Sequence, residues 1–120
     1  MPFQISSDAL DTAIGTVLGQ DEDKKSYAIY YISKNLSPGE LNYTVTKKEF
    51  LAIIYAINKF KHYITRYPVV LYTDHSTIKY LANKPVTNGK VTRWLILLQE
   101  FDITFKDRTR KENPVADFLS

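Results

Sequence analysis

Four acidic side chains occupy positions from which carboxylates could act together on a substrate. Asp8 lies near the end of the first expected strand, and Glu49 lies in the first turn of a long expected helix. Asp74 ends a short apolar run, and Asp117 falls in an expected final helix. In open α/β sheets, ligands gather at the edge where the strands end. These four residues are therefore the candidates for a site.

A metal site in this chain would be built mainly from oxygen ligands. The 120 residues include no cysteine and two histidines, His62 and His75. Oxygen ligands select hard cations such as Mg²⁺ or Mn²⁺. Converging carboxylates repel one another unless a cation joins them, and two such ions about 3.5–4 Å apart can activate a water and stabilise the leaving oxygen of a phosphodiester. The residue types fit two-metal hydrolysis, provided that the side chains converge.

Each acidic residue also fits an ordinary structural role. Residues 46–49 match a capping box, in which Glu49 would accept a hydrogen bond from the N-cap amide. Helical geometry instead places Glu49 on the flank of the apolar stripe, facing partly inward. Asp117 could favour the helix dipole, and Asp8 and Asp74 could be turn or capping residues. The pattern alone leaves these alternatives open.

The elements that would position these residues follow from the spacing of the apolar residues. The expected strands are Phe3–Leu10, Ala13–Gln20, Ser26–Asn35, Pro68–Thr73 and Asp102–Lys106, with a solvated turn at residues 21–25. The expected helices are Thr46–Ile64, Ser76–Ala82, Val91–Phe101 and a last one through Ala116–Leu119, opened by Asn113 and Pro114. Short joins make the first three strands an antiparallel meander, and a crossover helix makes part of the sheet parallel. The order βββαβααβα predicts an α/β fold with a mixed five-stranded sheet and helices packed on it.

Composition bounds the possible functions. The length suits one domain, and no repeat, low-complexity tract or linker interrupts it. No apolar run approaches the roughly 18 residues that a membrane span needs, and the N-terminus does not resemble a signal peptide. Sixteen basic against 13 acidic residues give a net charge of +3, a mild preference for a polyanionic partner.

Five sequence blocks run in order along nearly the whole chain. They read PFQISSDAL with AIGTVLGQ, AIYYISKNLSPGELNYTVTKKEFLAIIYAINKFKHYI, VVLYTDHSTIKYL, RWLILLQEFDITF and ENPVADFLS. In this order and spacing they resemble the ribonuclease H domain that follows the polymerase in gypsy-type LTR retrotransposons, and they are closest to its plant members. The resemblance implies a ribonuclease H-like fold and one domain over residues 1–120, the excised C-terminal part of a reverse transcriptase polyprotein.

The activity implied by this resemblance is hydrolysis of the RNA strand of RNA–DNA hybrids during reverse transcription. The acidic quartet of the family falls on Asp8, Glu49, Asp74 and Asp117, which would bind two Mg²⁺ ions, with Mn²⁺ a possible substitute. Asp8 would bridge both ions, Glu49 and Asp74 would complete one site, and Asp117 the other. In-line attack by an activated water would leave a 5′-phosphate and a 3′-hydroxyl.

The resemblance also implies the partners of the domain. They are the RNA–DNA hybrid and the polymerase domain of the parent polyprotein, with no membrane and no small-molecule cofactor. Thr44 and Thr46 lie where related enzymes make polar contacts with the hybrid, and Glu49 would contact the RNA 2′-hydroxyl, which distinguishes RNA from DNA. The implied location is intracellular and cytoplasmic, in the virus-like particle of a retroelement.

The chain departs from the family pattern in four respects. Leu10 stands where a serine is common, and residues 107–113 lack the usual proline and glycine. Asp107 stands where cellular relatives place a loop histidine and many retroelements a tyrosine. A basic, substrate-gripping insertion is also missing. Val86–Arg93, with Lys84 nearby, could partly compensate or could be an ordinary loop before a helix.

Two other functions compete with an active hybrid nuclease. One is a catalytically silent ribonuclease H-like module that serves as a structural or nucleic-acid-binding domain. The other is a DNA-cutting enzyme of the same superfamily, such as an integrase or resolvase. All four acidic residues are present, although only metal chemistry requires them together, and this favours the active nuclease.

Overall fold

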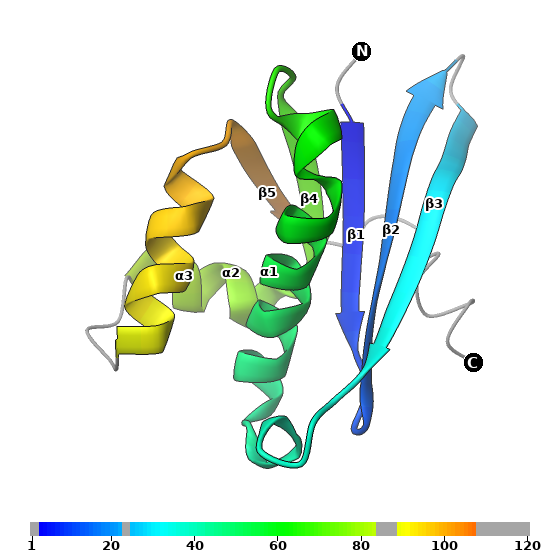
Figure 1. Cartoon of the computed structure of the whole chain (residues 1–120). Coiled ribbons are helices and arrows are strands. Elements are labelled where there is room, and N and C mark those ends of the chain that lie inside the picture. Colours follow the sequence, from blue (N-terminus) through cyan, green and yellow to red (C-terminus); the bar gives the residue numbers. More distant parts are fainter. Residues whose placement is uncertain (1–2, 23–24, 84–88, 108–120) are drawn as a thin grey trace.

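One mixed sheet of five strands runs through the chain (Figure 1). The computed structural model describes residues 3–22, 25–83 and 89–107. The strands are β1 (Phe3–Ala9), β2 (Ala13–Glu22), β3 (Lys25–Asn35), β4 (Val69–Thr73) and β5 (Ile103–Asp107). They lie in the order β3-β2-β1-β4-β5. The pairs β1–β2 and β2–β3 are antiparallel, whereas β1–β4 and β4–β5 are parallel. The structure therefore confirms the predicted mixed sheet.

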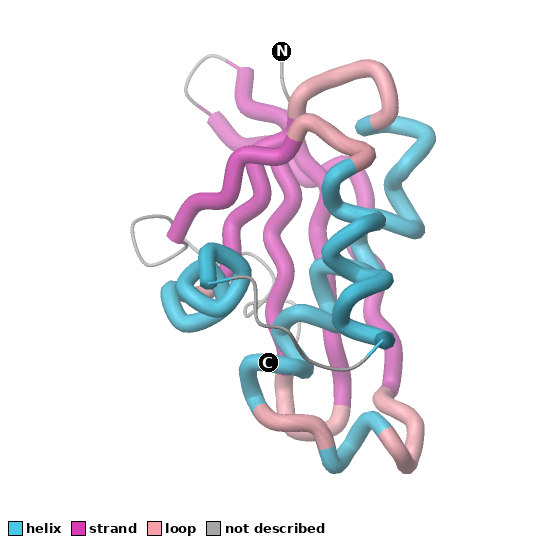
Figure 2. The backbone as a smooth tube through the Cα atoms, turned by 90° about the vertical axis from the view of Figure 1, so that its left-hand side faces the viewer, coloured by secondary structure: helices cyan, strands magenta, loops and turns pink. Residues whose placement is uncertain are grey.

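Helices lie against this sheet and connect its parallel strands. They are the 3₁₀-helix η1 (Glu40–Asn42) and the α-helices α1 (Val45–Ile64), α2 (His75–Asn83) and α3 (Gly89–Gln99). Helix α1 packs on β1 and β2 and contacts both α2 and α3, while α2 also contacts β5. A short connection leads from the end of α3 into β5 (Figures 1 and 2). No described helix has both the length and the hydropathy needed to cross a membrane.

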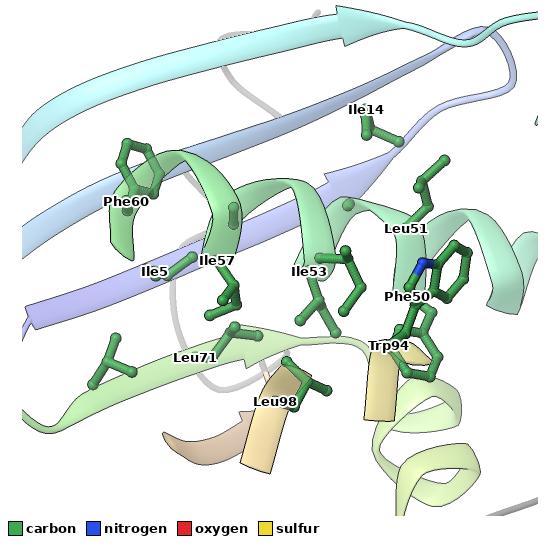
Figure 3. Packing of buried hydrophobic residues seen from close by; sticks show 14 of the residues in the cluster. Ile5, Ile14, Phe50, Leu51, Ile53, Ile57, Phe60, Leu71, Trp94 and Leu98 are labelled. Carbon is green, nitrogen blue, oxygen red and sulfur yellow. The ribbon is translucent and has the colours of Figure 1, made fainter. Parts of the chain in front are cut away.

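The apolar stripe of α1 forms the centre of the hydrophobic core (Figure 3). Its side chains recur at helical spacing and are almost completely buried, namely Phe50, Ile53, Ile57, Phe60 and Ile64. They pack with Ile5, Ile14, Leu18 and Leu71 of the sheet and with Trp94 and Leu98 of α3. Complete burial of one such side chain stabilises the fold by about 1.5–3 kcal/mol. This packing fixes where α1 lies along β1.

The observed boundaries differ from the predicted ones mainly at the ends of elements. The expected turn over residues 21–25 is shorter, because β2 runs on through Glu22 and β3 begins at Lys25. Backbone pairing between β2 and β3 continues there as far as Glu22↔Lys25, although the run of charged residues favoured a turn. The short helix η1 was not predicted. The expected last helix, Ala116–Leu119, lies outside the described residues, and so does Asp117.

A matched pair of isoleucines tests the core of α1. Ile57 is 0% exposed, whereas Ile96 on α3 is 57% exposed. Ile57→Ala should lower the free energy of unfolding by about 2–5 kcal/mol, because it removes buried methyl groups and leaves a cavity. Ile96→Ala should change it by less than about 0.5 kcal/mol. Urea unfolding followed by circular dichroism measures both, and similar losses for the two variants would contradict this packing.

Candidate active site

The carboxylates of Asp8 and Glu49 meet at one backbone amide. The Ala9 N–H donates to Asp8 Oδ1 at 2.9 Å and to Glu49 Oε1 at 3.1 Å. Asp8 stands near the end of β1 and is 8% exposed, and Glu49 in α1 is 2% exposed. Since both oxygens lie within hydrogen-bond distance of the same nitrogen, the structure brings together these two predicted site residues.

Such a pair of acidic side chains favours the binding of a cation. Two neighbouring carboxylates with little exposure to water repel each other when both are ionised. A divalent cation between them removes that repulsion. The available ligands are carboxylate oxygens, which suit Mg²⁺ or Mn²⁺. Asp8 and Glu49 therefore fit a hard-cation site in their chemistry and in their placement.

The start of helix α1 decides where Glu49 points. Thr44 is the N-cap residue, and its hydroxyl accepts a hydrogen bond from Lys47 N at 3.2 Å. The helix begins at Val45, so Glu49 lies just after the first turn. The alternative capping box over residues 46–49 is therefore wrong. Glu49 accepts from Ala9 instead, in another element of the fold.

A reciprocal capping box occurs earlier, in the loop that leads to α1. Glu40 Oε1 accepts from Ser37 N at 2.8 Å, while Ser37 Oγ accepts from Glu40 N at 3.4 Å. Lys34 Nζ adds an ion pair to Glu40 at 3.2 Å. The backbone hydrogen bond from Ser37, followed by the Ser37 hydroxyl and Lys34, lowers the pKa of Glu40 despite its partial burial. This box orders the chain just before Thr44.

Asp74 follows directly after β4 and caps the next helix. Its Oδ1 accepts from Thr77 N at 2.8 Å, at the start of α2. The capping role considered for Asp74 is therefore confirmed. The parallel pairing of β1 with β4 includes Ser6↔Tyr72, and Asp8 and Asp74 each lie two residues further along. The two aspartates therefore occupy equivalent positions at the same edge of the sheet.

These placements do not yet make a complete metal site. Within residues 3–22, 25–83 and 89–107, no three aspartate, glutamate or histidine side chains lie close enough together to hold a metal ion. Asp74 occupies the position on β4 that corresponds to Asp8 on β1, and its carboxylate caps the start of α2. Asp117, the predicted fourth ligand, lies outside the described residues.

Buried hydroxyl groups lie next to these carboxylates and were missed from the sequence. Ser7 and Thr16 pair across β1 and β2, and their hydroxyl oxygens are 3.3 Å apart. Thr73 and Thr77 are 0% exposed, and among the described residues their hydroxyls have no hydrogen-bond partner. The sequence does carry a signal for this group. Polar residues stand at strand positions where a buried apolar side chain is expected.

The remaining residues singled out from the sequence are Thr44 and Thr46, at the start of α1, and Asp107, in the edge strand β5. Thr44 is exposed and already caps α1, while Thr46 is partly buried in the first turn of that helix. Asp107 is the last residue of β5 and pairs with Thr73 of β4. The observed strand therefore extends one residue beyond the predicted end at Lys106.

Comparison with protein families gives one match that covers most of the chain. A family model described as the RNase H-like domain found in reverse transcriptase matches residues 1–101. The Drosophila melanogaster "Retrovirus-related Pol polyprotein from transposon 297" is 36% identical over 98% of this chain and 11% of its own length. The Schizosaccharomyces pombe "Transposon Tf2-3 polyprotein" is 36% identical over 97% of the chain and 9% of its own length. The chain thus spans about a tenth of the length of these relatives.

Solved structures with the same fold include viral and cellular proteins. A foamy viral protease-reverse transcriptase in complex with double-stranded DNA aligns with a TM-score of 0.72 and 20% identity, over 88% of this chain and 19% of its own. LC11-RNase H1 in complex with an RNA/DNA hybrid aligns with a TM-score of 0.66 and 16% identity, over 98% of this chain and 99% of its own. At these identities the likeness shows the fold, which is that of ribonuclease H.

Two substitutions of Asp74 separate its capping role from any role in chemistry. Asp74→Ala removes the acceptor for Thr77 N and should lower the free energy of unfolding by about 0.5–2 kcal/mol. Asn caps helices about as well as Asp, so Asp74→Asn should leave stability nearly unchanged. Denaturant unfolding measures both variants. Equal losses for Ala and Asn would show that the charge, rather than the cap, stabilises this end of α2.

The lowered pKa of Glu40 predicts a specific dependence of stability on pH. A carboxyl group whose pKa falls on folding below its ordinary value of 4.5 stabilises the fold above that pH. The contribution disappears as the pH falls through the folded-state pKa. Wild type should therefore be more stable than Glu40→Gln at pH 7, and the difference should shrink below about pH 4.5. Unfolding curves for both proteins between pH 7 and 3 test this, and a constant difference would contradict it.

Proposed function

Because this chain belongs to the family of RNase H-like domains found in reverse transcriptase, we propose that it is a metal-dependent endonuclease that hydrolyses the RNA strand of RNA–DNA hybrids. The observation that carries this proposal is the meeting of Asp8 and Glu49 at the Ala9 amide. The equivalent position of Asp74 on the neighbouring parallel strand adds support. A hybrid-bound RNase H1 with the same fold is consistent with this substrate.

In this proposal the four carboxylates would hold two Mg²⁺ ions, with Mn²⁺ a possible substitute. The ligands would be Asp8, Glu49, Asp74 and Asp117. When bound, the ions would supply the positive charge that activates water and stabilises the leaving oxygen. The Ala9 N–H orients the Asp8 and Glu49 carboxylates towards the same point. Glu49 is also the residue proposed to accept a hydrogen bond from the RNA 2′-hydroxyl, which DNA lacks.

The cleavage would leave a 5′-phosphate and a 3′-hydroxyl, the ends expected from in-line attack on the phosphorus. Thr44 and Thr46, at the start of α1, would make polar contacts with the hybrid. We place the activity in reverse transcription by a gypsy-type LTR retrotransposon, inside a cytoplasmic virus-like particle. The parent polyprotein would supply the polymerase. The retrotransposon polyproteins similar to this chain support that context.

One observation favours a second candidate, a catalytically silent module that binds nucleic acid. The Asp74 carboxylate is used as a helix cap, and the described residues contain no group of three metal-binding side chains. A silent module would retain the fold and the hybrid-binding surface without holding the two ions. Cleavage assays separate the two candidates directly.

The decisive test incubates the domain with a labelled RNA–DNA hybrid, duplex DNA or duplex RNA in Mg²⁺ or Mn²⁺. We expect cleavage of RNA in the hybrid alone, and loss of cleavage in EDTA. Asp8→Asn, Glu49→Gln and Asp74→Asn should each lower the rate by about 100-fold or more. Substitution of a residue that only hydrogen-bonds to a metal ligand already lowers metal affinity or activity by about 10–100-fold. Asp102 is an exposed acid just before β5, and Asp102→Asn is the matched control, which should cleave normally.

The other outcomes identify the alternatives. Binding of the hybrid without cleavage in either metal would support the silent module. Cleavage of duplex DNA would indicate another enzyme of the same fold. Full activity in Glu49→Gln would contradict the proposed metal site even if the domain cleaves the hybrid.

A further inference from the structure

The residue that Asp74 caps carries a buried hydroxyl group of its own. Thr77 is 0% exposed, and its N–H donates to Asp74 Oδ1 at 2.8 Å. The Asp74 carbonyl accepts from Ile78 N at 3.2 Å, so Asp74 is the N-cap residue of α2 and Thr77 is the third residue of the helix. Among the described residues, the Thr77 hydroxyl has no hydrogen-bond partner. A buried hydroxyl therefore stands unused in the first turn after a candidate metal ligand.

We propose that Thr77 is a positioning residue for Asp74, whose hydroxyl donates to the Asp74 carboxylate when that carboxylate turns from the start of α2 towards a divalent cation. The inference rests on the proposed function, because it assumes that Asp74 is a metal ligand. Asp74 would keep a hydrogen-bond donor from α2 in both positions, the Thr77 amide in one and the Thr77 hydroxyl in the other. Thr77 itself would touch neither the cation nor the substrate.

The contacts at the start of α2 form only half of a capping box. In a complete box, the N-cap side chain accepts from the amide of the third helical residue, and the side chain of that residue accepts from the N-cap amide. The box formed by Ser37 and Glu40 has both bonds. At the start of α2, the bond from Thr77 N to Asp74 is made, but the Thr77 hydroxyl does not complete the pair. The hydroxyl therefore does not support the helix start in this arrangement.

A buried hydroxyl without a partner is unfavourable for the stability of the fold. It makes hydrogen bonds to water in the unfolded chain and loses them on burial. Valine has nearly the same shape as threonine and would fill this position without that loss. Conflicts between stability and residue type are expected where a residue serves a function. A role in the candidate site accounts for a hydroxyl of Thr77 that the fold does not use.

The chemistry of the two groups suits a hydrogen bond between them. A threonine hydroxyl rotates to suit its acceptor, and an ionised carboxylate accepts at both of its oxygens. Carboxylates that bind a metal are themselves hydrogen-bonded, and these bonds fix their orientation. The Thr77 hydroxyl belongs to the residue whose amide already lies 2.8 Å from Asp74 Oδ1. A rotation of the carboxylate, without a movement of the backbone, would therefore bring the two groups together.

Thr73 provides a comparison with the same residue type and the same burial. It is also 0% exposed, and its hydroxyl also lacks a partner in the part of the chain that the structure describes. Thr73 ends β4, and the alternation along the strand places its side chain on the same face of the sheet as Val69 and Leu71. It takes no part in the bond that caps α2. Substitution of Thr73 therefore tests the loss of a buried hydroxyl alone.

The experiment measures the affinity of the 120-residue chain for Mn²⁺ by a titration followed by electron paramagnetic resonance. We expect Thr77→Val to bind Mn²⁺ about 10-fold more weakly than wild type, since loss of a hydrogen bond to a metal ligand costs about 10–100-fold in affinity. Thr77→Ser, which retains a hydroxyl, should bind nearly as tightly as wild type. Thr73→Val should also stay close to wild type.

Urea unfolding and a double-mutant cycle show whether the effect passes through Asp74. Thr77→Val should unfold in metal-free buffer at the same urea concentration as wild type or at a higher one, because it removes a buried hydroxyl without a partner. A weaker affinity for Mn²⁺ then does not reflect a loss of stability. In the Asp74→Asn background, Thr77→Val should cause no further loss of Mn²⁺ affinity, because the two residues act as one unit.

Amide hydrogen exchange tests the turn of the carboxylate itself. Exchange at the Thr77 amide should become faster in wild type when Mg²⁺ is added, because the Asp74 carboxylate then leaves that amide. The same addition should not change exchange at Thr77 in Asp74→Ala, which has no carboxylate to move. Unchanged exchange in wild type at a Mg²⁺ concentration that supports binding would contradict the turn.

The inference is overturned if Thr77→Val binds Mn²⁺ as tightly as wild type, or if Thr77→Ser or Thr73→Val loses as much affinity as Thr77→Val. Absence of Mn²⁺ binding by wild type would overturn it together with the proposed metal site. A chain that cleaves the hybrid and whose Mn²⁺ affinity is unchanged in Thr77→Val keeps the nuclease proposal and loses this one. A chain whose Mn²⁺ affinity depends on Thr77, but which does not cleave the hybrid, keeps the role of Thr77 and loses the nuclease assignment.

Discussion

The Ala9 amide donates to a carboxylate of its own strand and to a carboxylate of helix α1. This double contact forms only if the start of α1 lies over the end of β1. The Thr44 cap determines where the helix begins, and the packing of Ile53 and Ile57 on the sheet determines how far along β1 it lies. A shift of one residue would rotate Glu49 by about 100° around the helix axis. The candidate site therefore depends on the whole α1–sheet interface.

The same contact imposes an energetic constraint on the fold. Two acidic groups with little exposure lose hydration and repel each other. The hydrophobic core beneath α1 must offset that cost, because residues Phe50 to Ile64 of the same helix are the main apolar contributors. Conflicts between local stability and residue type are expected at functional sites. The position of Glu49, almost completely buried at one end of the apolar stripe of α1, is such a conflict.

The periodicity of apolar residues predicted the architecture, because the sheet buries alternate residues and α1 buries one stripe. The strands, the three α-helices of the described residues and the mixed sheet are confirmed, with shifts at their ends. Local motifs were less informative. Both Thr46–Glu49 and Ser37–Glu40 match the capping pattern, and only the second forms. The difference depends on where the chain leaves β3 and on the Ala9 amide, and neither is encoded within four residues.

Different interactions position the three candidate site residues that the structure describes, Asp8, Glu49 and Asp74. Parallel pairing of β1 and β4 sets Asp8 and Asp74 at equivalent positions, so the backbone alone accounts for their proximity in the fold. The position of Glu49 depends on α1 and on the Thr44 cap at its start. The Asp74 carboxylate caps α2, and in the proposed metal site it would turn towards a cation shared with Asp8. A cap worth about 0.5–2 kcal/mol is small beside the attraction between a carboxylate and a divalent ion in a site of low exposure. Capping of α2 by Asp74 is therefore compatible with the proposed metal binding by the same residue.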